Sequence, residues 1–76
     1  MTKLNVKLEK IKDIEHFINL AKNYDFDIDF ISGKYVVNGK SIMGVLSLDL
    51  TKPIEVHIHS DNAEKFVYEI KEYCVK

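Results

Sequence analysis

Apolar and polar residues alternate strictly in three stretches of the chain, residues 4–8, 26–30 and 54–59. This period of two is typical of strands that bury one face. In residues 54–59, β-branched residues occupy one face and polar residues the other, so we expect this strand to lie centrally in the sheet. Ser32, Gly33 and Lys34 separate residues 26–30 from residues 35–37, which predicts a hairpin.

Three other segments show helical spacing. The first runs over residues 13–23 with Asp13 as N-cap, and its apolar positions are Ile14, Phe17, Ile18 and Ala21. A short second helix is predicted after Ser41, another capping residue, and Pro53 prevents its continuation. Its apolar positions are Ile42, Val45, Leu46 and Leu48.

The last predicted helix follows a capping box in which Asp61 is the cap and Glu64 lies three residues later. Its apolar stripe consists of Phe66, Val67, Ile70, Tyr73 and Cys74. The resulting order is β-α-β-β-α-β-α. It predicts an α+β open-faced β-sandwich, in which three helices cover one face of a four-stranded antiparallel sheet. A length of 76 residues fits one domain spanning residues 1–76.

Composition narrows the class of protein. No apolar run is long enough to span a bilayer and no secretion signal is found, so we expect a cytoplasmic protein that does not contact membranes. The net charge is −1 and all eleven basic residues are lysines, which argues against direct nucleic-acid binding. The single cysteine, Cys74, is expected in the core, and no cofactor is expected.

The segment Lys-Ser-Ile-Met-Gly-Val-Leu-Ser-Leu over residues 40–48 resembles the regulatory-serine segment of HPr, the small phosphocarrier of bacterial sugar uptake. Phe17, Ala21 and Lys22 also resemble the first helix of that family. The resemblance covers nearly the whole chain. It implies the same fold and a protein of the sugar phosphotransferase system that is not an enzyme.

The phosphorylated histidine of the family lies at the start of the first helix, in a His-Ala-Arg-Pro-type motif. The corresponding positions here are Lys10, Ile11, Lys12 and Asp13. A protonated lysine is a poor nucleophile, and Asp13 and Glu15 oppose an incoming phosphoryl group. The resemblance, with this departure, predicts a regulatory or protein-binding module of the kind found in histidine-lacking, catabolite-repression paralogues.

Ser41 is the predicted regulatory phosphorylation site, because the family's serine at this place is phosphorylated by a dedicated kinase. The alternative is that Ser41 only caps a helix. By the resemblance, Lys12 could pair with a phosphate on Ser41, although a solvated surface charge is the simpler interpretation. Lys40 belongs to the same predicted partner-binding segment.

Ile42, Met43 and Leu46 match the apolar patch with which the family meets its partners. We expect Met43 to be exposed for docking, whereas Ile42 and Leu46 remain open between docking and core. The implied partners are HPr kinase, a catabolite-control transcription regulator or other phosphotransferase-system proteins. We expect a monomer or weak dimer.

The three histidines leave further alternatives open. His16 is the candidate acceptor if the chain is still a phosphocarrier, and a purely structural protein-interaction module is the remaining function class. His57 and His59 lie two residues apart on one strand and therefore share a face. They would need an added carboxylate to bind zinc, and solvated histidines are the commoner case.

Overall fold

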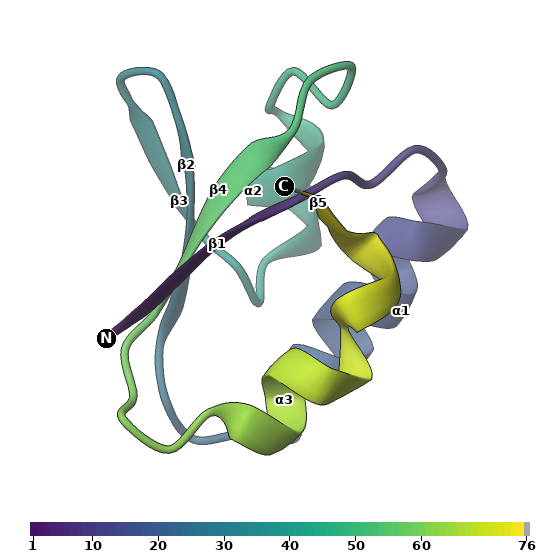
Figure 1. Cartoon of the computed structure of the whole chain (residues 1–76). Coiled ribbons are helices and arrows are strands. Elements are labelled where there is room, and N and C mark those ends of the chain that lie inside the picture. The colour runs from purple at the N-terminus through teal and green to yellow at the C-terminus, as the bar shows by residue number, and fades with distance from the viewer. Residues whose placement is uncertain (76) are drawn as a thin grey trace.

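The computed structural model describes residues 1–75 and confirms the α+β open-faced fold (Figure 1). Its elements are β1 (Thr2–Val6), α1 (Ile11–Ala21), β2 (Ile28–Ser32), β3 (Tyr35–Asn38), α2 (Ile42–Leu46), β4 (Ile54–Ile58), α3 (Glu64–Glu69), the 3-10 helix η1 (Lys71–Tyr73) and β5 (Cys74–Val75). None of the helices in residues 1–75 is long and apolar enough to cross a membrane.

The sheet has the strand order β3-β2-β4-β1-β5, and all its pairs are antiparallel. β4 occupies the centre as predicted, because β2 pairs on one side of it and β1 on the other. The hairpin between β2 and β3 turns through Gly33 and Lys34, and Gly33 adopts a φ of 60° that glycine accommodates without strain.

A fifth strand corrects the predicted sheet of four. The last helix ends at Glu69, whereas its predicted apolar stripe extends to Cys74. Cys74 instead lies in β5, opposite Val6 of β1. The amide of Lys7 donates to the carbonyl of Tyr73 at 2.8 Å and extends this pairing. Unpaired backbone groups along β1 are costly, so strand pairing prevails over continuation of the helix.

The starts of two helices also differ from the predictions. α1 begins at Ile11, so Asp13 lies in its first turn and is not the N-cap. α3 begins at Glu64, and Asp61 instead accepts a hydrogen bond from the amino terminus at 3.2 Å. Only Ser41 is confirmed as an N-cap, since its Oγ accepts from the amide of Gly44 at 3.3 Å.

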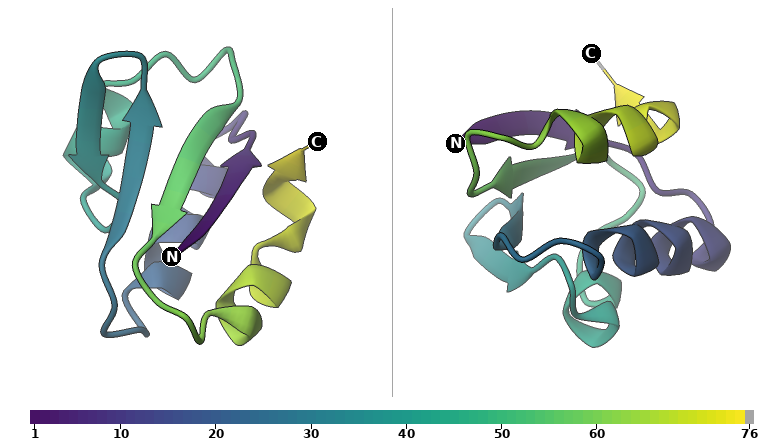
Figure 2. Two further views of the ribbon diagram at one scale, coloured as in Figure 1. Left: turned by 60° about the vertical axis from the view of Figure 1, so that its left-hand side comes forward. Right: turned by 90° about the horizontal axis from the view of Figure 1, so that it is seen from below.

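One apolar core lies between the sheet and the helices. In the left view of Figure 2, the strands lie in front of α1 and α2, which cover one face. Phe17 of α1 is fully buried, and its ring meets Phe30 of β2 and Phe66 of α3 edge-on, with centroids 5.1 and 5.6 Å apart. The opposite face carries polar side chains such as Asp29, Glu55 and His57, as the alternation predicts.

Candidate functional site

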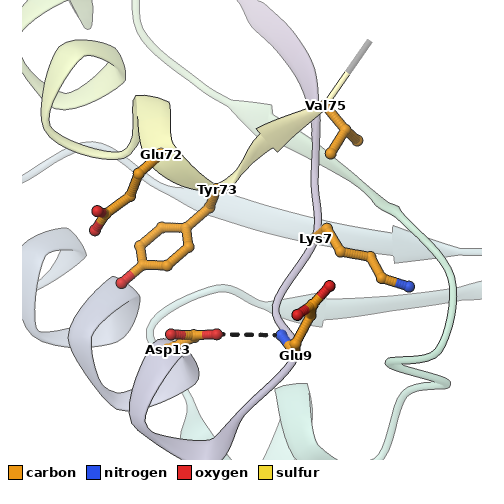
Figure 3. A pocket seen from close by; sticks show the side chains of 6 residues that line it. All are labelled: Lys7, Glu9, Asp13, Glu72, Tyr73 and Val75. Atoms are coloured by element: carbon orange, nitrogen blue, oxygen red, sulfur yellow. Dashed lines mark hydrogen bonds between the residues drawn. The ribbon is translucent and has the colours of Figure 1, made fainter.

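At the start of α1, a carboxylate from the first turn accepts hydrogen bonds from the backbone amides that precede the helix. Lys10 is the N-cap residue in extended conformation, and it contributes no side-chain hydrogen bond to the cap. Instead, Oδ2 of Asp13 accepts from the amide of Lys10 at 3.2 Å and from that of Glu9 at 3.3 Å. Figure 3 shows the bond to Glu9. A carboxylate at a helix N-terminus interacts favourably with the helix dipole. A carboxylate therefore lies beside the position at which the family resemblance places the phosphorylated histidine.

A shallow pocket of about 400 Å³ lies beside this helix start. The side chains that line it are Lys7, Glu9, Asp13, Glu72, Tyr73 and Val75 (Figure 3). Three of these residues, Glu9, Asp13 and Glu72, carry carboxylates. The one ammonium group, that of Lys7, donates to the carbonyl of Thr51. The electrostatic potential of such a lining disfavours a phosphate dianion.

Tyr73 joins the C-terminal segment to α1. Its hydroxyl lies 2.7 Å from Nδ1 of His16, and Oε1 of Glu72 lies 3.7 Å from the same nitrogen. Burial, followed by the nearby carboxylate of Glu72, raises the pKa of Tyr73 to about 12, so the hydroxyl stays protonated and can donate. One ring nitrogen of His16 is thus already engaged. The sequence placed Tyr73 only in an apolar stripe, because a contact across 57 residues leaves no local signal.

Lys10 and Lys12, at the start of α1, differ in their surroundings from Lys40, which precedes Ser41. Lys10 and Lys12 are exposed, and within residues 1–75 the side chain of Lys12 has no hydrogen bond or ion pair. Lys40 is half-buried, and its Nζ donates to the carbonyl of Tyr24 at 2.5 Å. Lys40 therefore ties the start of α2 to the segment that follows α1.

An apolar surface projects from α2 beside Ser41. Met43 is 76% exposed, Ile42 39% and Leu46 41%, whereas Val45 is fully buried. The predicted exposure of Met43 is confirmed, and Ile42 and Leu46 prove to be surface residues as well. Because α2 has only five residues, Val45 is the one position of the helix that reaches the core. We call Ile42, Met43 and Leu46 the α2 apolar surface.

The remaining histidines are paired with carboxylates on the polar side of the sheet. Nε2 of His57 contacts Oε2 of Glu55, and Nε2 of His59 lies 2.7 Å from Oδ2 of Asp29. In the part of the chain that the structure describes, no group of three or more metal-ligating His, Cys, Asp or Glu side chains comes together.

Cys74 lies in β5, although the sequence placed it on the last helix. It is half-buried and packs against the core. Burial raises the pKa of its thiol, which disfavours the reactive thiolate.

Comparison with known proteins identifies the family of this chain. Residues 11–75 match the model of the family described as "PTS HPr component phosphorylation site". The chain belongs to the HPr family. The match begins one residue after Lys10, so the N-cap position itself lies outside it. No relative was found among curated proteins.

Two solved HPr structures have the same fold. HPr-C-His from Thermoanaerobacter tengcongensis is 19% identical with a TM-score of 0.78, covering 95% of this chain and 89% of the other. The phosphocarrier protein HPr from Bacillus anthracis str. Ames is 23% identical with a TM-score of 0.71, covering 97% and 94% of the two chains. This chain is therefore an HPr-family protein of the phosphotransferase system that shares the fold at low sequence identity.

Proposed function

We propose that this HPr-family protein is a regulatory or protein-binding module of the cytoplasm and not a phosphohistidine carrier. The observation that carries the proposal is the start of α1. Lys10 stands there as N-cap, and the carboxylate of Asp13 accepts from the amides of Glu9 and Lys10. A phosphoryl acceptor at this place would need a nucleophile such as histidine. The carboxylates of the adjoining pocket disfavour both the binding and the transfer of a phosphoryl group.

Phosphorylation of Ser41 is the proposed switch. A phosphate would add a charge of about −1.5 to −2 beside the α2 apolar surface. Ser41 is half-buried, and its Oγ accepts a hydrogen bond from the amide of Gly44. In phosphoserine, the phosphate oxygens could accept from this amide in place of Oγ. The change would therefore alter what the surface presents to a partner while leaving the helix capped.

Protein docking on the α2 apolar surface is the proposed means of recognition. Ile42, Met43 and Leu46 together expose apolar side chains along a short helix, next to the proposed switch. The partners we propose are HPr kinase, a catabolite-control transcription regulator or other phosphotransferase-system proteins.

Labelling with phosphoenolpyruvate and enzyme I tests the loss of carrier function. We expect no acid-labile phosphate on the protein under conditions that label a histidine-bearing HPr to completion. His16→Ala is the matched variant, because His16 is the alternative acceptor. Labelling of the native chain that disappears in His16→Ala would contradict the proposal and establish a carrier of another kind.

Treatment with HPr kinase and ATP tests the switch. We expect one phosphate on the native protein and none on Ser41→Ala, while Ser47→Ala, which alters the serine at the other end of α2, is phosphorylated like the native chain. An unmodified native protein, together with equal partner binding by Ser41→Asp and native protein, would favour the purely structural module.

A further inference from the structure

β3 forms an edge of the sheet and has no charged residue, proline or bulge among its four residues. Its sequence is Tyr-Val-Val-Asn, without charge or proline, and Tyr35 and Val36 are 71% and 63% exposed. Natural edge strands are commonly blocked by lysine, proline or a bulge, because unpaired backbone groups can pair with another chain. β3 lies outermost in the strand order, beyond β2 (Figure 1).

The hydrogen bonds of the hairpin define which backbone groups of β3 are free. The amide of Gly39 donates to the carbonyl of Ile28 at 2.7 Å, so this residue faces β2. Alternation along the strand places Val37 and Tyr35 on the same side. The amide and carbonyl of Val36 therefore point away from the sheet. Within residues 1–75, Val36 forms no hydrogen bond outside the strand ladder.

We propose that β3 pairs with β3 of a second copy of this chain, antiparallel about a two-fold axis at Val36. In this register the two Val36 residues face each other and exchange both of their free hydrogen bonds. Tyr35 lies opposite Val37 of the second copy, and Lys34 lies opposite its Asn38. The pairing extends the sheet across both molecules.

Self-complementarity favours a second copy over an unrelated strand. The two-fold register brings no like charges face to face, because the one charged residue, Lys34, meets a neutral asparagine. The net charge of −1 adds little repulsion between copies. Since β3 has only four residues, the interface is small, and we expect rapid exchange with a dissociation constant on the order of 1 mM.

A dilution series followed by ¹H–¹⁵N NMR tests the dimer. Amide shifts that depend on protein concentration are expected in residues 34–38, together with slower tumbling at high concentration. Spectra that do not change up to the millimolar range, or shifts centred on β5 or α2, overturn the proposal.

Opposite charges at Val36 test the register. Val36→Lys and Val36→Glu should each abolish the concentration-dependent shifts, and an equimolar mixture of the two should restore them, because the axis places Lys opposite Glu. Ile11→Lys, at a similarly exposed apolar residue on α1, should associate like the native chain. Val36→Pro, a second variant, removes the outward amide without taking a donor from the β2–β3 ladder, and it should also abolish the concentration-dependent shifts. Association that persists in Val36→Lys, or a mixture that stays monomeric, refutes the two-fold pairing.

Discussion

At the scale of single residues, a few side chains at the start of α1 support the proposal that this protein is not a phosphohistidine carrier. Lys10 and Asp13 could be read directly from the sequence, but the role of Asp13 could not. It was predicted as N-cap, whereas it caps from the third helical position by reaching back to the amide of Lys10. The error arose because Ile11 is exposed, so α1 begins before its apolar stripe does.

Two tyrosines, Tyr24 and Tyr73, are predicted to lose their protons only at unusually high pH. A hydrogen bond to the carboxylate of Glu69 raises the pKa of Tyr24 to about 12, and burial raises that of Tyr73 to about 12, both from an ordinary 10.0. The folded chain therefore holds these protons more tightly than the unfolded chain. Their contribution to stability is fully present below pH 10 and is lost as the pH rises toward 12.

Near-ultraviolet absorbance of tyrosinate, measured against pH, checks this prediction. Tyr24→Phe and Tyr73→Phe should each remove one late-titrating group from the folded protein, and Tyr35→Phe, at an exposed position on β3, is the matched control. A native titration curve that coincides with that of the urea-unfolded chain would show that neither tyrosine is shifted.

At the scale of elements, α2 depends on local chemistry that the sequence reveals well. A helix of five residues is too short to be stable alone, so its cap and its one buried residue decide whether it forms. Both Ser41 and Val45 were assigned correctly from spacing. The exposure of Ile42 and Leu46 could not be assigned, because it depends on how much of the helix the sheet covers.

Removing the cap of α2 should destabilise the protein. Ser41→Ala loses the bond to the amide of Gly44 and is expected to lower the free energy of unfolding by about 1 kcal/mol. Ser41→Asp keeps a side-chain acceptor for this amide and should retain most of the native stability. The pair of variants therefore isolates the contribution of the cap to stability from any effect of phosphorylation. Urea unfolding measures both effects. Equal losses in the two variants would show that the cap does not contribute.

At the scale of the whole molecule, one aromatic cluster connects elements that are distant in the chain. Phe17 of α1 contacts Phe30 of β2 and Phe66 of α3, and it approaches Tyr73 of η1 with a centroid distance of 6.5 Å. Its burial was predicted from helical spacing, but its partners were not. The integrity of the site beside α1 therefore depends on the same core as the sheet.

Truncating this core residue should cost much of the stability of so small a domain. Phe17→Ala is expected to lower the free energy of unfolding by about 3–5 kcal/mol, because it leaves a cavity among three elements. Met43→Ala, at a residue 76% exposed, should change it by less than about 0.5 kcal/mol. Chemical unfolding of the two variants side by side checks the contrast, and similar losses would contradict the packing described.

The sequence by itself determined the type and order of the main elements, the buried faces of β1, β2 and β4, the cap at Ser41 and the lysine at the start of α1. These features follow from local periodicity and from residue chemistry within a few positions. Only the tertiary structure decided that β5 pairs with β1, that Tyr73 meets His16 and that β3 remains an open edge. Such contacts join residues far apart in the chain, and their formation depends on competition among all the unpaired backbone and side-chain groups of the fold.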